Sequence, residues 1–152
     1  MRKILNIAHV YMILGLVSGL YYREITKLTG FTGDTQLGVV HTHVLALGML
    51  FFLIVLALEK LFALTSSRLF GWFFWIYNVG LALTVAMMLL HGTLTVLGHP
   101  SGAAIAGVSG LGHILLTVGL ILLFVTLGKR IPAKPASAGD PAPADTAQPS
   151  AL

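Results

Sequence analysis

Four long apolar runs constrain this chain more than any other feature of its sequence. They lie near Ile4–Tyr22, Leu37–Leu58, Leu69–Leu97 and Ala103–Leu127. A hydrocarbon layer of about 30 Å is crossed by about 20 helical residues, so each run is long enough to span a bilayer. Of the 152 residues, 57% are apolar and only 9% are charged, which is not the composition of a soluble domain.

The continuity of these runs predicts an all-α fold. Backbone groups inside a bilayer must be hydrogen-bonded within the protein, so a spanning run is helical unless strands close a barrel. Barrel strands alternate polar and apolar residues, and these runs do not. The predicted fold is a four-transmembrane-helix bundle over residues 1–130. Gly15 and Gly19 form a GxxxG motif, and glycines recur in the fourth run, which indicates close helix packing or room for a flat cofactor.

The charged and aromatic residues between the runs predict an orientation. One side of the membrane carries Arg2, Lys3, Lys60, Arg68, Lys129, Arg130 and Lys134, whereas Arg23 and Lys27 fall in the loop on the other side. By the positive-inside rule both termini are cytoplasmic. Trp72, Trp75 and Tyr77 come near the internal start of the third run, where aromatic residues are expected at a headgroup boundary.

The two ends of the sequence predict a retained first span and a disordered tail. No small-residue cleavage site and no polar mature domain follow the first run, so it is not interpreted as a signal peptide. Residues 131–152 hold five of the six prolines and no aromatic residue. Such a Pro/Ala-rich segment buries too little apolar surface to offset the entropy of ordering, and we expect a disordered cytoplasmic tail.

Composition excludes several functional classes. The net charge of +4 resides beside the spans, which leaves no basic surface for nucleic acid. The absence of cysteine excludes disulfides, thiolate metal sites and cysteine-linked haem. No acid–base pair, nucleophile or phosphate loop defines an enzyme. Histidine is the remaining candidate ligand.

Four of the histidines within the apolar runs share the predicted external third of the membrane. His41 and His43 follow the start of the second run by one to two turns, His91 precedes the end of the third by about two turns, and His113 lies a little over two turns into the fourth. An ionisable side chain in a bilayer is costly without a partner, so each is a functional candidate. A single histidine is most simply bonded to a nearby carbonyl or hydroxyl; for the four together, ligation is favoured.

The spacing of His41 and His43 favours haem over zinc. Two positions apart on a helix is about 200° of rotation, so the two side chains leave on nearly opposite faces. Zinc requires a compact tetrahedral set, whereas b-type haem takes one imidazole from each side, between apolar walls. Gly48, Gly92 and Gly112 lie near the candidates and would admit a porphyrin, or would simply pack helices.

Other polar residues have weaker assignments. Arg23 and Lys27, with Tyr21 and Tyr22, lie at the same predicted depth, where they would bind haem propionates or anchor the helix at the interface. The remaining histidines, His9 near the inner face and His99 in the second external turn, are interpreted as structural.

The segment HTHVLALGMLFF, residues 41–52, resembles the haem-ligating helix of the catalytic subunits of haem-copper oxidases and nitric oxide reductases. The whole chain resembles a family of small four-span bacterial membrane proteins of uncharacterised function related to that superfamily. The resemblance implies haem b and one four-helix arc of a twelve-span subunit. It further implies a trimer in which His41 of one chain and His43 of its neighbour bind each haem. It also implies copper near His91, although the family's adjacent histidine pair and tyrosine are missing here.

The leading hypothesis is a b-type haem protein of the bacterial cytoplasmic membrane that serves electron transfer or haem-based redox or gas chemistry. Its candidate ligands are His41, His43, His113 and His91, with Arg23 beside the cofactor. Expected partners are the lipid bilayer, further copies of the chain, and a quinol or respiratory electron donor. The alternative is a histidine-lined transporter or channel for a metal ion or proton, against which stands the lack of a deep carboxylate. A structural subunit of a larger respiratory complex is a third hypothesis.

Overall fold

The computed structural model describes residues 1–100 and 102–131, and these form an all-α bundle. Three long helices are continuous: α1 (Arg2–Thr29), α4 (Arg68–Val96) and α5 (Ala103–Arg130). The second span is built from α2 (Leu37–His43), the π-helical segment η1 (Val44–Leu50) and α3 (Phe51–Phe62). Four helices in the described part of the chain are long and apolar enough to cross a membrane, which confirms the predicted all-α fold with four candidate spans.

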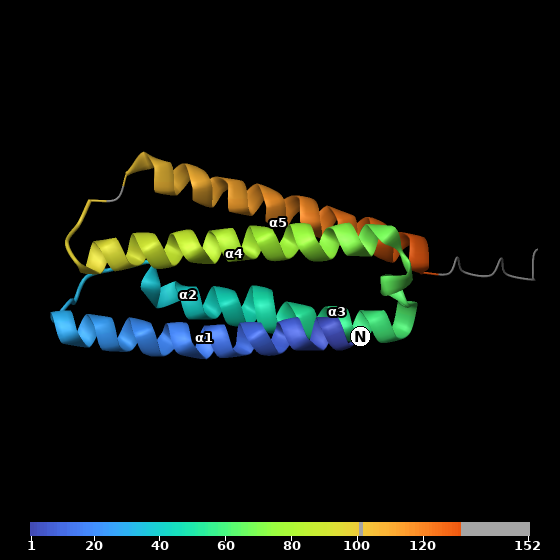
Figure 1. Ribbon diagram of the computed structural model, residues 1–152, viewed down its shortest axis with the longest axis horizontal. Coiled ribbons are helices and arrows are strands. Elements are labelled where there is room, and N and C mark those ends of the chain that lie inside the picture. Colours follow the sequence, from blue (N-terminus) through green and yellow to red (C-terminus); the bar gives the residue numbers. More distant parts are fainter. Residues whose placement is uncertain (101, 132–152) are drawn as a thin grey trace, which may run out of the picture.

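The helices lie side by side along one long axis, with α4 between α5 and the pair formed by α1 and α2–α3 (Figure 1). The connection 30–36 and residues 97–100, which follow α4, lie at one end of the bundle, called here the Gly30 end (Figure 1). Residue 1, the connection 63–67 and the end of α5 lie at the other, the Met1 end (Figure 1). The short 3₁₀ turn η2 (Leu64–Ser66) belongs to the Met1 end.

The first helix is longer than the sequence predicts. Arg23 and Lys27, expected in a loop, lie in the last two turns of α1, because no glycine or proline occurs between Gly19 and Gly30. Gly30 ends it in the left-handed conformation, with φ of 64°. The amide of Phe31 then bonds to the carbonyl of Thr26 at 3.0 Å, so the chain turns within a few residues.

The π-helical segment is the main departure from regular helix. In η1 each amide bonds to the carbonyl five positions earlier, as the bond from the amide of Phe51 to the carbonyl of Ala46 shows. Tyr77 of α4 donates its hydroxyl to the carbonyl of Leu47 at 3.0 Å, which satisfies a backbone group inside this segment. The π turn therefore has a specific partner on the neighbouring helix.

Aromatic rings fill the centre of the bundle between α1, α3 and α4. Phe51 stacks on Tyr77 with ring centroids 4.5 Å apart, and Tyr11 stacks on Phe52 at 6.0 Å. Tyr77 is only 1% exposed, so the prediction that it anchors the chain at a headgroup boundary is wrong. Trp72 and Trp75, which are 65% and 68% exposed, keep the surface position expected of them.

The connection at the Met1 end is fastened by a buried carboxylate. Glu59, in the last turn of α3, accepts hydrogen bonds from the amide of Thr65, at 2.8 Å, and from the Thr65 hydroxyl. Ala63 takes a left-handed conformation, with φ of 49°, to end the helix. Arg2, Lys60, Arg68 and Arg130 lie at this same end, as the distribution of charge predicts. The predicted disordered tail, apart from Ile131, lies outside the described residues.

Candidate functional site

The four histidines singled out from the sequence all lie in the half of the bundle nearer the Gly30 end. His41 and His43 are in the second turn of α2, His91 is in the last two turns of α4, and His113 is in the third turn of α5. The other two lie elsewhere: His9 is exposed in the second turn of α1 near the Met1 end, and His99 is exposed in the turn after α4.

His43 and His113 share one hydrogen-bonding arrangement. Nδ1 of His43 lies 2.8 Å from the carbonyl oxygen of Val39, and Nδ1 of His113 lies 2.9 Å from that of Ser109, in each case four residues earlier on the same helix. A carbonyl only accepts, so each Nδ1 carries the proton. The lone pair of the neutral ring is then on Nε2, the form in which histidine binds a metal through that nitrogen.

His41 and His91 have a different arrangement. Nδ1 of each ring is buried and has no hydrogen-bond partner among the described residues. His41 packs against α1, since a Cβ placed on Gly19 would come within 3.6 Å of the His41 Cβ. No hydrogen bond among the described residues therefore fixes which ring nitrogen of His41 or His91 carries the proton.

His41 and His43 lie on nearly opposite faces of α2, as the sequence predicts. Because α2 is a regular α-helix through residue 43, the side chains of His41 and His43 leave about 200° apart. His41 contacts α1, so His43 lies on the side turned away from α1. Among the described residues no group of three or more His, Cys, Asp or Glu side chains is placed to hold a metal ion. The prediction of copper at His91 stays a prediction.

The glycines beside the histidines serve helix packing. A Cβ on Gly48 would lie 2.7 Å from the Cβ of Tyr11, and one on Gly92 would lie 2.6 Å from the amide of Leu37. Gly112 is closed by Thr84, whose amide nitrogen would lie 3.0 Å from the added carbon. At these three positions neighbouring residues fill the space that a side chain would take, which favours the helix-packing interpretation; haem binding stays a prediction.

Arg23 is exposed and its guanidinium lies 3.5 Å from the carboxylate of Glu24, the next residue along the chain. An exposed pair of this kind contributes little to stability and leaves the arginine free to move. The two neighbouring tyrosines face the bundle: Tyr22 packs on Gly38 of α2, and Tyr21 bonds to Thr93 of α4. The predicted role of Arg23 beside a propionate stays a prediction.

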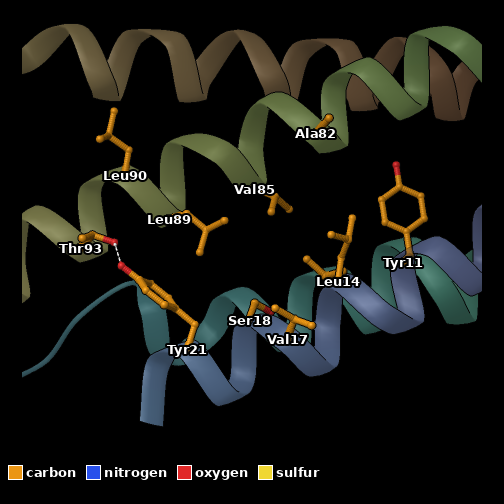
Figure 2. A pocket seen from close by; sticks show the side chains of 11 residues that line it. Tyr11, Leu14, Val17, Ser18, Tyr21, Ala82, Val85, Leu89, Leu90 and Thr93 are labelled. Atoms are coloured by element: carbon orange, nitrogen blue, oxygen red, sulfur yellow. Dashed lines mark hydrogen bonds between the residues drawn. The ribbon is translucent and has the colours of Figure 1, made fainter. Parts of the chain in front are cut away.

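A groove between α1 and α4 is a feature that the sequence did not predict. It encloses about 600 Å³, and Figure 2 shows side chains from both helices along its length. Nearly all of its lining is apolar, and no histidine contributes; the lining residues are Tyr11, Leu14, Val17, Ser18, Tyr21, Val44, Ala82, Val85, Leu89, Leu90 and Thr93. Asn78, an amide within an apolar run, was the available signal, because polar groups in such runs need partners.

Two hydrogen bonds join the helices at the ends of this groove. The hydroxyl of Tyr11 donates to Oδ1 of Asn78 at 2.7 Å toward the Met1 end, and the hydroxyls of Tyr21 and Thr93 lie 3.0 Å apart toward the Gly30 end. The tyrosine side chains thus bridge α1 and α4 at both ends while aliphatic side chains line the space between (Figure 2).

The described part of the chain therefore offers two chemical features: two imidazoles whose Nδ1 atoms bond to helix carbonyls, and an apolar groove with a hydroxyl pair. Comparison with curated proteins gives no match, and comparison with solved structures gives none either. A family model with the description "Protein of unknown function (DUF2871)" matches residues 1–130, which is the whole helical region. The chain belongs to this family of small proteins.

Proposed function

We propose that this chain is a membrane protein that binds b-type haem through histidine near the Gly30 end of the bundle, and that it serves electron transfer. Histidine-ligated haem iron, when bound, supplies reversible one-electron chemistry. The Met1 end faces the cytoplasm of a bacterial cell in this proposal, because the basic residues gather there.

One observation carries the proposal: the same hydrogen-bonding arrangement at His43 and at His113. Both rings donate from Nδ1 to a helix carbonyl, which is the outer contact that orients ligating histidines and raises their basicity. Both lie on apolar helices, where an imidazole without a partner is costly. His113 is exposed and His43 is half-buried, so an incoming group can reach both rings.

The structure also limits where haem would fit. The glycines near the histidines are filled by neighbouring side chains, and the α1–α4 groove contains no histidine. A haem would therefore lie on the outer surface of the bundle. Further copies of the chain would cover it there, three of them if the resemblance to the oxidase arcs holds. This is the reason we propose an oligomer.

Ligand variants test the proposal directly. The protein is expressed with added haem precursor, purified in detergent, and assayed by its Soret band and by pyridine haemochrome. We expect His43→Ala and His113→Ala each to remove the haem, because each ring supplies a ligand. His9→Ala and His99→Ala are matched controls and should bind as the native protein does.

These variants, together with His41→Ala, distinguish ligation by His43 and His113 from ligation by His41 and His43 of neighbouring chains. Loss of haem in His41→Ala with retention in His113→Ala would favour the His41–His43 pairing between chains that the resemblance implies. No Soret band in the native protein, or a band unchanged in His41→Ala, His43→Ala and His113→Ala alike, would contradict the haem proposal. Zinc or copper bound without porphyrin, with pH-dependent flux in vesicles, would favour the transporter instead.

Orientation has its own test because the chain contains no cysteine. Single cysteines are introduced at Thr32, in the 30–36 connection, and at Ser66, in the connection at the Met1 end; both residues are exposed. We expect a membrane-impermeant maleimide to label Thr32→Cys in intact cells and Ser66→Cys only after lysis. The reverse pattern would overturn the proposed orientation.

A further inference from the structure

The α1–α4 groove is mostly apolar, but two hydroxyl groups, those of Tyr21 and Thr93, lie at its Gly30 end. The hydroxyls of Tyr21 and Thr93 face each other at 3.0 Å across the two helices (Figure 2). Each hydroxyl has one proton, and their mutual bond uses only one of the two. The second proton remains available to an acceptor. The other two hydroxyls in the lining do not compete, because Ser18 donates to the carbonyl of Gly15 at 2.9 Å and Tyr11 donates to Oδ1 of Asn78 at 2.7 Å.

The charges near this end indicate a neutral partner. On an α-helix, Arg23 lies about 200° and Lys27 about 240° around from Tyr21, so neither cation shares its face. Glu24 lies about 60° from Tyr21 and is the charged residue nearest to that face in helical position. The Arg23 guanidinium lies beside this same carboxylate, at 3.5 Å. A phosphate headgroup would therefore meet a carboxylate before a cation.

We propose that the α1–α4 groove binds a neutral, lipid-soluble carbonyl compound with a long apolar body, of the isoprenoid quinone class. Its carbonyl accepts the free proton of the Tyr21–Thr93 pair, and its body lies along the aliphatic lining that Leu14, Val85 and Leu89 contribute. The volume of about 600 Å³ is that of a site for a small molecule. The inference rests on the groove and not on the histidines, so it stands or falls separately from haem binding.

Filling the groove is the first test. The full chain is reconstituted in phosphatidylcholine nanodiscs, and binding of radiolabelled decylubiquinone is measured. Val85→Trp places a large ring in the groove, whereas Val79→Trp makes the same change at an exposed position of α4 outside the lining. We expect Val85→Trp to weaken binding more than about tenfold and Val79→Trp to leave it unchanged.

Folding of each variant is checked by its helical circular dichroism. Val17→Trp, which fills the same groove from α1, is the second variant should Val85→Trp fail to fold. Native binding by a folded groove-filling variant would overturn the proposal.

The hydroxyl pair gives a sharper test. Tyr21→Phe leaves the proton of Thr93 free, and Thr93→Val leaves that of Tyr21 free, so each single variant keeps one donor. The double variant has none. We expect near-native affinity in both single variants and a loss of roughly threefold to tenfold in the double variant, the value of one hydrogen bond.

Native affinity for decylubiquinone in the double variant would show that the groove accepts any acyl chain. It would overturn the assignment of a carbonyl head. Displacement of the probe by phosphatidylglycerol as readily as by unlabelled decylubiquinone would overturn it too. Haem content measured in the same samples keeps the two proposals distinguishable, because loss of quinone binding with full haem content contradicts only this one.

Discussion

Helix α4 has two very different neighbours, α5 on one side and α1 on the other. Along the α4–α5 interface, a Cβ added to Gly80 would lie 2.9 Å from the backbone amide of Leu116, and one added to Gly119 would lie 2.9 Å from the Cβ of Tyr77. Along α1, by contrast, α4 leaves a groove of about 600 Å³. One helix thus packs closely against α5 on one face and leaves an opening toward α1 on another.

The difference follows from the residues on each face. Glycine lets backbones approach, and Gly80, Gly112 and Gly119 alternate from one helix to the other along the α4–α5 interface. The α1–α4 side has branched aliphatic side chains in those places and a tyrosine bridge at either end. Small residues close an interface, whereas the long reach of tyrosine holds two helices apart at a defined spacing.

Gly112→Ala should have the largest effect on this contrast. The added carbon would collide with the Thr84 hydroxyl and lie 3.0 Å from the Thr84 amide, which belongs to backbone that cannot move aside. We expect the free energy of unfolding to fall by about 2–3 kcal/mol, the usual result of overpacking. Unfolding by SDS titration in mixed micelles, followed by circular dichroism, measures it. Native stability would show that the interface is looser than described.

Tyr77→Phe should have the next largest effect. The change removes the hydrogen bond to the Leu47 carbonyl in η1 and leaves a buried acceptor without that donor. We expect a loss of about 1–2 kcal/mol in the same unfolding assay. Tyr22→Phe is the matched control, because the Tyr22 hydroxyl makes no hydrogen bond within the described residues. Equal losses in the two variants would argue against a specific role for Tyr77.

Tyr11→Phe tests the bridge at the Met1 end of the groove. Loss of its bond to Asn78 should lower the free energy of unfolding by about 1 kcal/mol and loosen the spacing of α1 and α4. Spin labels at Val10→Cys and Val79→Cys report that spacing by pulsed electron resonance, and we expect a broader distance distribution. An unchanged distribution would mean that packing alone sets the groove.

Gly107→Ala should have the smallest effect, of opposite sign. Among the described residues nothing lies within 4 Å of the added carbon, so no clash there opposes the higher helix propensity of alanine. We expect stability to rise by up to about 1 kcal/mol in the same assay. A loss comparable to that of Gly112→Ala would show that an unseen neighbour covers this part of α5, as a second copy of the chain would.

The sequence was sufficient for what depends on local composition. Long apolar runs predicted the four helices, and the GxxxG motif predicted a close contact that Gly15 and Gly19 make with α2 and η1. The end of α1 was missed because the positive charges of Arg23 and Lys27 suggested a loop, while Gly30 is the residue that stops the helix. Charge indicates which side of a membrane a residue occupies and does not indicate where a helix ends.

Features that depend on contacts between helices could not be predicted in the same way. The position of Tyr77 near the start of a run suggested a surface role, but its partners Phe51 and Leu47 lie on another span. The glycines near the histidines suggested room for a cofactor, whereas in the structure Tyr11, Leu37 and Thr84 pack against them. Of the candidate site, the opposite faces of His41 and His43 followed from helical geometry alone, whereas the groove depends on how far apart α1 and α4 lie.

The direction in which the histidines of α2 point, relative to α3, depends on the number of residues in the π-helical segment. A π turn holds about one more residue than an α turn, so deleting one residue between His43 and Phe51 would restore a regular helix. Everything on the N-terminal side would then rotate by about 100° relative to α3. Family members with a shortened segment should accordingly present their H-x-H motif to different neighbours, even with every side chain of the motif retained.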